Sequence, residues 1–282
     1  MKIGFSANVT SESVDVAVLA KRAEELGYDS FWMGEHPVFP VNSNSWSPYG
    51  DIPPFMPHMV DALVSLARAS GVTHKLKLGT AIFNLPEHNP LRLAKEVATL
   101  DHFSGGRVVF GIGAGWLREE TEIMGGDFQH RWAQTREAVL VMKELWTKEE
   151  AEFHGRFYDF PLVRSYPKPS QVPHPPILLG GNTPNVFKRT VALGDGWIPT
   201  RVSPEQIRVG RATLNELAGA AGRDPHGMDI TIFGVPGEVD VISAYEEAGA
   251  DRVIVRLPTS VGEAALEGLE SIAGQLRPWL LP

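Results

Sequence analysis

Short apolar runs rich in β-branched residues alternate along the chain with longer stretches in which apolar residues recur every three or four positions. The short runs are typical of parallel strands buried on both faces, and the longer stretches are typical of amphipathic helices. The eight strands that this pattern predicts are Lys2–Ala7, Ser30–Gly34, Lys75–Phe83, Arg107–Gly113, Pro176–Gly180, Gly196–Thr200, Asp229–Val235 and Arg252–Leu257. The eight predicted helices are Val14–Leu26, Met59–Ser70, Leu91–Phe103, Arg131–Trp146, Asn185–Leu193, Pro204–Ala221, Val239–Ala248 and Val261–Gln275.

The strand–helix unit repeats eight times in succession. This repetition predicts an α/β fold with parallel strands and one outer layer of helices, and eight units is the number that closes a (β/α)8 TIM barrel. A doubly wound open sheet is the alternative. No stretch of the sequence separates a second domain, so we expect residues 1–282 to form a single barrel domain.

Two long segments interrupt the regular spacing of strands and helices. The first, Pro37–His58, follows the second predicted strand and contains Trp46, Tyr49 and Phe55. The second, Glu149–Pro175, is an insertion between the fourth predicted helix and the fifth strand. Long loops in compact domains are usually functional lids or disordered linkers. The aromatic residues favour a packed lid or hairpin here.

The composition narrows the functional classes. The chain has no cysteine, which excludes disulfides, thiolate nucleophiles and cysteine-ligated metals, and this is typical of a cytoplasmic protein. A formal net charge of −8 argues against nonspecific nucleic-acid binding. No apolar run approaches the roughly 18–20 residues that a membrane span needs, and the first residues lack the pattern of a secretory signal. We therefore expect a cytoplasmic protein that acts on a small molecule and binds neither nucleic acid nor membrane.

His36 is the strongest catalytic candidate, because active sites of (β/α)8 barrels lie where strands run into the following helices. It is the one histidine among nine that lies at the C-terminal end of a predicted strand, while His58 and His88 lie in loops that could reach over this end. A histidine at this position can exchange a proton near neutral pH, or it can simply order the loop. Glu35 precedes it, and adjacent strand residues point to opposite faces, so a shared metal site is the less favoured interpretation.

Glycines alternate along the fourth predicted strand, at Gly111, Gly113 and Gly115. The spacing is similar to a dinucleotide-binding fingerprint, but the strand with an acidic end that should follow one helix later is missing. Because alternate residues share one face of a strand, the glycines leave that face bare. We expect this face to give room for a flat ring beside Gly113 and Gly115, with close backbone packing as the alternative.

The turn after the fifth predicted strand is a candidate anion site. Gly181, Asn182 and Thr183 lead into a helix, where backbone N–H groups can bind a phosphate and barrels often do so. Asn182 and Thr183 could add side-chain hydrogen bonds. The alternative is an ordinary capped helix start.

In their order along the chain, these segments resemble the bacterial luciferase-like monooxygenase superfamily, and within it the F420-dependent oxidoreductase branch. The resemblance covers residues 2–200 well and the last quarter of the chain only loosely. The segments that carry it are Ser30–His36, Leu78–Ile82 with Asn89–Pro90 behind it, Ser104–Glu120, Phe153–Tyr158, and Pro175–Gly181 with Gly194–Trp197.

The resemblance implies a barrel with a hairpin insertion around residues 150–175 and a cofactor ring in the mouth. An acidic residue followed by histidine touches the reacting centre in deazaflavin relatives, which corresponds to Glu35 and His36, with glutamate in place of the commoner aspartate. It also implies a non-proline cis peptide bond at Ala81–Ile82 that supports the ring, with Asn84 facing the cofactor.

By the same resemblance, the phosphate of the cofactor would lie against Gly181, Asn182 and Thr183. Some relatives that bind flavin phosphate have an arginine near the position of Ala114. Its absence here favours coenzyme F420 over flavin mononucleotide (FMN).

The chemistry that follows is hydride transfer between the deazaflavin and a small organic substrate, with His36 exchanging the accompanying proton. Trp46, Tyr49, Phe55 and Trp116 would exclude water from the ring. An FMN-dependent monooxygenase, a barrel that binds flavin without turnover, and an isomerase or aldolase are the alternatives. No lysine ends a predicted strand, which removes the obvious Schiff-base residue of an aldolase.

Substrate contacts are expected from the loop Pro37–His58 and from Arg201 and Arg256, which could bind an anionic substrate or form structural ion pairs. Relatives often dimerise, so we expect a homodimer.

Overall fold

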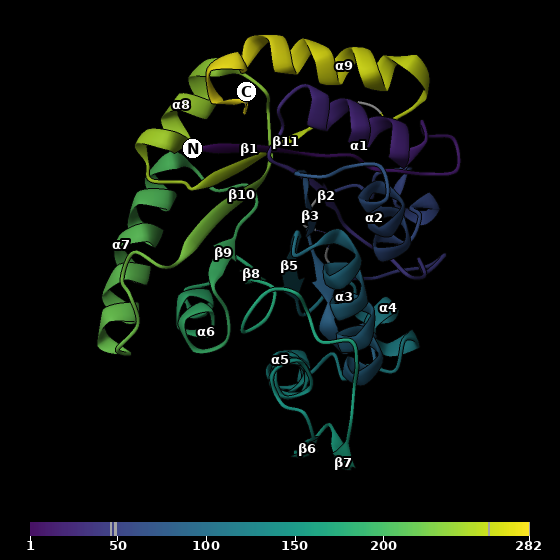
Figure 1. Ribbon diagram of the computed structural model, residues 1–282, viewed down its shortest axis with the longest axis vertical. Helices are drawn as coiled ribbons and strands as arrows, with labels where there is room; N and C mark the ends of the chain where they lie inside the picture. The colour runs from purple at the N-terminus through teal and green to yellow at the C-terminus, as the bar shows by residue number, and fades with distance from the viewer. Residues whose placement is uncertain (46, 48–49, 259, 282) are drawn as a thin grey trace.

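The computed structural model describes residues 1–45, 47, 50–258 and 260–281 and shows a closed barrel of parallel strands surrounded by helices (Figure 1). The strand order is β3-β2-β1-β11-β10-β9-β8-β5-β4, and pairing of β3 with β5 closes the ring. The barrel strands are β1 (Lys2–Ser6), β2 (Ser30–Met33), β3 (Lys77–Thr80), β4 (Phe83–Asn84), β5 (Val108–Gly113), β8 (Ile177–Gly180), β9 (Gly196–Ile198), β10 (Asp229–Val235) and β11 (Arg252–Arg256). The (β/α)8 prediction is confirmed, and the open-sheet alternative is wrong.

The third predicted strand, Lys75–Phe83, is divided in the structure. β3 ends at Thr80, a cis peptide bond joins Ala81 to Ile82, and β4 then pairs with the end of β5. The cis bond lies at the position that the family resemblance implies. The interruption turns Ile82 out of the strand register at the mouth of the barrel.

The helices lie outside the barrel, as their apolar stripes predict. Their bounds are α1 (Val16–Glu25), α2 (Ala62–Ser70), α3 (Pro90–Ser104), α4 (Arg118–Ile123), α5 (Arg131–Thr147), α6 (Asn185–Leu193), α7 (Pro204–Ala220), α8 (Val239–Glu247) and α9 (Gly262–Gln275). Three short 3₁₀ helices add η1 (Met56–His58), η2 (Leu85–Glu87) and η3 (Arg277–Trp279). Eight helices fall within the predicted ranges or within one residue of them. α4 was not predicted, because one and a half turns with three glutamates carry no apolar stripe.

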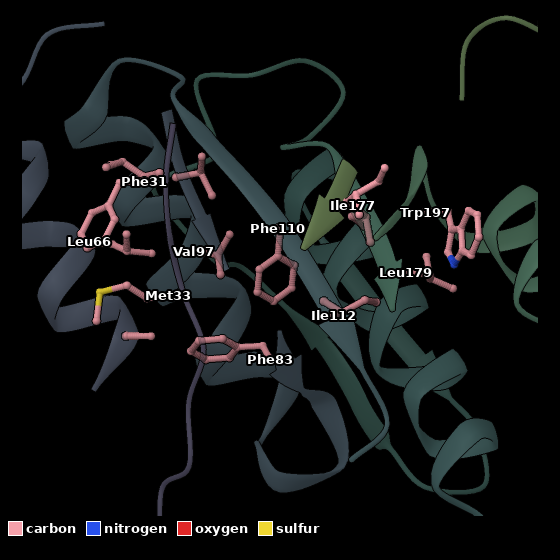
Figure 2. Packing of buried hydrophobic residues seen from close by; sticks show 14 of the residues in the cluster. Phe31, Met33, Leu66, Phe83, Val97, Phe110, Ile112, Ile177, Leu179 and Trp197 are labelled. Carbon is pink, nitrogen blue, oxygen red and sulfur yellow. The ribbon is translucent and has the colours of Figure 1, made fainter. Parts of the chain in front are cut away.

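The hydrophobic core has two parts, separated by the strands. Alternate residues of each strand face outward and pack against the helices, as Phe31 and Met33 of β2 do. Figure 2 shows side chains of this outer layer from β2, β5, β8 and β9 together with Leu66 of α2 and Val97 of α3. The intervening residues face inward and fill the barrel interior; they are Trp32, Val109, Leu178, Ile198 and Ile254.

Glycine allows the interior to hold an indole ring. A Cβ at Gly79 of β3 would overlap the ring of Trp32, which is fully buried. The Trp32 Nε1–H donates to the Ser30 hydroxyl at 2.7 Å, so the polar edge of the ring is satisfied inside the barrel. The interior below the mouth is therefore a packed core, and any ligand must bind above it.

The insertion Glu149–Pro175 contains an antiparallel hairpin of β6 (Ala151–His154) and β7 (Asp159–Val163). It extends beyond α5, at the end of the view opposite α9 (Figure 1). Over the part of the chain that the structure describes, no helix combines the length and apolar character of a membrane span.

Candidate functional site

Strand alternation places His36 and Glu35 on opposite sides of the barrel wall. His36 continues the inward face of β2 beyond Trp32, whereas Glu35 continues the outward face beyond Phe31 and Met33. His36 therefore lies at the mouth, at the carboxyl end of the strands, as predicted. Glu35 lies behind it, between the strands and the outer segments.

Glu120 of α4 holds the imidazole of His36. The distance from His36 Nδ1 to Glu120 Oε2 is 2.7 Å, and the Glu120 side chain is fully buried. The rings of Phe39 and Trp116 meet the imidazole edge-on, at centroid distances of 5.3 and 5.8 Å. With Nδ1–H donating to Glu120, the imidazole keeps Nε2 for another partner. Histidines that act as general acids or bases are often oriented by a carboxylate in this way.

Glu35 interacts with His88 instead. The distance from His88 Nε2 to Glu35 Oε1 is 2.7 Å, and the His88 ring stacks on Phe83 at 5.0 Å. Burial raises the pKa of Glu35, although the hydrogen bond from His88 opposes this shift. Burial disfavours the charged form of His88, but the hydrogen bond to Glu35 prevails and raises the histidine pKa. Among the described residues the carboxylate that contacts His36 is thus Glu120. Glu35, which the family resemblance places at the reacting centre, contacts His88 instead.

A third buried carboxyl group, Glu87 of η2, lies next to Glu120. Burial raises its pKa to about 8, and the neighbouring charge of Glu120 adds to the shift. Thr121 donates a 2.9 Å hydrogen bond to Glu87 Oε1, while Glu87 Oε2 and Glu120 Oε1 are buried with no partner among the described residues. We call Glu35, Glu87 and Glu120 the carboxyl cluster. At neutral pH it holds at least one proton, on Glu87.

Substituting Glu87 with glutamine should change how stability depends on pH. In the unfolded chain Glu87 loses its proton above pH 4.5, but in the folded protein it keeps it to about pH 8. The native state then binds more protons, so stability falls as pH rises through this window, by on the order of 3–5 kcal/mol in total. Glutamine stays neutral throughout.

We expect the difference in unfolding free energy between E87Q and the wild type to shift in favour of E87Q from pH 5 to pH 8, measured by urea denaturation. E216Q, which changes an exposed glutamate of α7, is the control. A difference that stays constant over this range would contradict the assignment of a proton to Glu87.

Asn84 belongs to the same cluster. Its backbone N–H points to Glu35 Oε1 at 3.4 Å, and its side chain hydrogen-bonds to Glu87. A Cβ at Gly115 would approach Glu87 Oε1 to 3.0 Å and the Asn84 side chain to 3.7 Å. Gly115 has a φ of 81°, which favours glycine by itself. The position predicted to face the cofactor is therefore 6 % exposed and bound to the carboxyl groups behind the mouth.

Ile82 fills the space beside the strand glycines. A Cβ at Gly113 would overlap Ile82 Cδ1, and one at Gly180 would approach it to 2.6 Å. A Cβ at Gly111 would overlap the carbonyl oxygen of Thr80. The expectation of a bare face is thus wrong, and the alternative of close packing holds. The glycines let Ile82 lie across the opening between β3, β5 and β8, where Ala81 and Ile82 remain partly exposed.

The predicted anion turn is exposed and is not an ordinary helix cap. Asn182 Nδ2 donates to the Thr200 carbonyl at 2.7 Å, and α6 begins at Asn185 without a side-chain cap. Gly181 has a φ of 122°, and its carbonyl accepts a 2.7 Å hydrogen bond from Trp197. Thr183 is exposed beside them. These two hydrogen bonds fix the shape of the turn on its protein side, and Gly181, Asn182 and Thr183 are exposed on the other side.

Two clefts flank the mouth. One of about 970 Å³ lies at the ends of β1, β10 and β11 and is lined by Asn8, Phe55 and Arg256, among others. The other, of about 510 Å³, lies beyond β5. Of the residues predicted to exclude water, Trp116 contacts His36, whereas Trp46 and Tyr49 lie outside the described residues.

Comparison with known proteins decides the family. The sequence model of the family of luciferase-like monooxygenases matches residues 5–257 of this chain. The chain is a luciferase-like monooxygenase family member. This luciferase-like chain is 34 % identical to an uncharacterised protein of Mycobacterium tuberculosis, over 98 % of this chain and 99 % of the relative. It is 32 % identical to an F420-dependent glucose-6-phosphate dehydrogenase of Kineococcus radiotolerans, over 82 % of this chain and 66 % of the relative.

Solved structures show the same fold. The luciferase-like chain superposes with a TM-score of 0.77 on an F420-dependent secondary alcohol dehydrogenase in complex with an F420-acetone adduct, at 20 % identity, covering 99 % of this chain and 98 % of the other. At this identity the likeness concerns the fold.

His36 lies at the carboxyl end of the strands, as the sequence predicts, but its partner Glu120 was not predicted. Glu120 is 84 residues away, and it reaches His36 only because barrel closure and the turn into α4 bring them together. Its place just after the glycine strand was the available signal. Glu87, three residues beyond Asn84, carried no signal at all.

Proposed function

We propose that the protein is an F420-dependent oxidoreductase that transfers a hydride between the deazaflavin and a small organic substrate. The observation that carries this proposal is the His36–Glu120 pair at the carboxyl end of the strands. The apolar side chain of Ile82 lies at the same end of the barrel, against Gly113 and Gly180. The F420-dependent relative and structural neighbour named above support the choice of cofactor.

The residues at the mouth fit a planar ring bearing a phosphate-linked chain. Ile82, held across the opening by the absence of side chains at Gly113 and Gly180, would support one face of the ring together with Ala81. Gly115 and Asn84 form the wall between the ring position and the carboxyl cluster. The exposed turn at Gly181, Asn182 and Thr183 would hold the phosphate.

Coenzyme F420 supplies two-electron hydride chemistry at a ring carbon, since carbon replaces the N5 of a flavin. His36 would handle the proton. With Nδ1 bonded to Glu120, Nε2 can accept the hydroxyl or amine proton of a substrate that is being oxidised and return it in the reverse direction. The His36 side chain is 7 % exposed, and the rings of Phe39 and Trp116 contribute to this shielding from water. Glu35 would act on the site indirectly, through its hydrogen bonds with His88 and with the backbone N–H of Asn84.

Titration of the purified protein with F420 and with FMN tests the proposal. We expect saturable binding of F420 at micromolar concentrations, followed by fluorescence, and FMN affinity at least tenfold weaker. Tighter binding of FMN would replace the proposal with a flavin-dependent monooxygenase. Tight F420 binding with no change of its redox state across a panel of alcohols and imines would leave a binding protein without turnover.

A further inference from the structure

Three arginines lie against two aromatic rings. Arg118 and Arg131 are the first residues of α4 and α5, and Arg189 lies in the middle of α6. The guanidinium groups of Arg118 and Arg131 lie over the ring of Phe128, with their central carbons 4.7 and 4.0 Å from its centroid. Arg189 lies over the ring of Trp132 at 4.0 Å. We call Arg118, Arg131 and Arg189 the arginine cluster.

The arginine cluster adjoins the turn predicted to hold phosphate. A Cβ at Gly181 would lie 4.0 Å from the ring of Trp132, on which Arg189 is stacked. The cluster also adjoins His36, because the 510 Å³ cleft is lined by Trp116, Arg118 and Arg131, and Trp116 contacts the imidazole. The cleft thus connects the surroundings of His36 to Arg118 and Arg131. Arg189 lies outside the cleft lining, on the ring of Trp132 beside the Gly181 turn.

Two of these cations lack a carboxylate partner among the described residues. Arg131 donates to the carbonyl of Phe128 at 3.0 Å, and its Nε is buried without any partner. For Arg189 the structure shows the contact with the Trp132 ring and no carboxylate among the described residues. Arg118, in contrast, forms an exposed ion pair with Glu122 at 3.3 Å. Glu119 also lines the cleft, but Ser43, Ser45 and the backbone of Asn44 already donate to it.

The cations repel one another. Burial lowers the pKa of Arg131, and the charge of Arg118 lowers it further. The pKa of Arg189 is lowered likewise, first by burial and then by the charge of Arg131. In a chain with a net charge of −8, three neighbouring guanidinium groups, two of them without a carboxylate partner among the described residues, indicate a site for an anionic ligand.

We propose that the arginine cluster binds the anionic tail of the deazaflavin coenzyme. The proposal rests on the proposed function. Beyond its ring, coenzyme F420 carries a phosphate diester and glutamate carboxylates, and planar guanidinium groups bind both kinds of oxyanion with paired hydrogen bonds. Phe128 and Trp132 hold the side chains in place by stacking, which leaves their N–H groups for the ligand.

The test compares the full coenzyme with its ring-and-ribityl precursor, which lacks the phosphate and the glutamates. Dissociation constants are measured by fluorescence for the wild type, R131Q, R189Q and the double variant. R136Q, which changes an exposed arginine of α5 for which the structure shows no partner among its described residues, is the control. Circular dichroism melts confirm that each variant is folded.

We expect the wild type to bind the full coenzyme at least tenfold more tightly than the precursor. R131Q and R189Q should each weaken binding of the full coenzyme by about 10- to 100-fold, the usual loss for a charge-assisted hydrogen bond, and leave the precursor unaffected. R136Q should behave as the wild type. The preference for the full coenzyme should also decline as salt is raised.

Equal wild-type affinity for both ligands, or unchanged binding of the full coenzyme by R131Q and R189Q, overturns the inference and leaves the proposed function standing. A wild type that binds neither ligand removes the proposed function itself, and the inference with it.

Discussion

Replacing His36 with alanine is expected to lower turnover by a factor of about 10²–10⁴ while the affinity for coenzyme stays nearly unchanged. The imidazole is the titratable group on the inward face of β2 at the mouth, and Glu120 fixes its Nδ1 at 2.7 Å. Its removal would eliminate proton transfer to the substrate but leave Ile82 and the Gly181 turn, which we propose to support and anchor the ring. Steady-state kinetics combined with coenzyme titration separate the two effects.

H36N provides the sharper comparison. Its amide can still donate to Glu120, so the carboxylate keeps a partner, but no nitrogen remains that can exchange a proton. We expect H36N to be as inactive as H36A and more stable. H226N, at an exposed position on the connection after α7, should match the wild type. Near-normal turnover in H36N would show that His36 only orders the loop.

Replacing Glu120 with alanine should produce the second largest loss, about 10²-fold in kcat. Without Oε2 the imidazole loses the bond that sets its orientation and its tautomer, and a buried N–H is left unpaired. E120Q should recover part of the activity, because its carbonyl oxygen can still accept from Nδ1–H. Since Glu120 is fully buried and does not face the ring position, coenzyme affinity should change little.

The same substitution has a second effect that a purely structural role for Glu120 would not explain. The charge of Glu120 contributes to the raised pKa of Glu87, so that pKa should fall in E120A. The decline in stability between pH 5 and pH 8 should then become shallower. Wild-type kcat in E120A would reject the assignment of Glu120 as the residue that positions His36.

The barrel could be predicted from the sequence because its signals are local. Each buried strand appears as an apolar run, each outer helix as an amphipathic stripe, and their strict alternation leaves few topologies. The position of His36 followed from the same reasoning, since the end of β2 faces the mouth. α4 escaped prediction because a six-residue helix is stabilised by its contacts and has no periodic pattern of its own.

The site was less predictable because its contacts join distant segments. Glu35 and His36 are neighbours in sequence, yet alternation turns Glu35 outward to His88 and leaves Glu120 to contact His36. The glycine alternation of β5 predicts empty space beside the strand, whereas Ile82, in the break between β3 and β4, lies in that space. The pairing of Ile82 with Gly113 and Gly180 depends on three strands meeting, which no single stretch of sequence encodes.

The central claim is that a planar redox ring binds at the mouth against Ile82, within reach of the His36 imidazole. A crystal structure of the protein with coenzyme F420 tests it most directly. We expect one face of the ring on Ile82, its reactive carbon on the side of the His36 imidazole, and its phosphate at Gly181. A ring bound in the cleft beside Asn8 and Arg256, with Ile82 and His36 out of contact, would contradict the account.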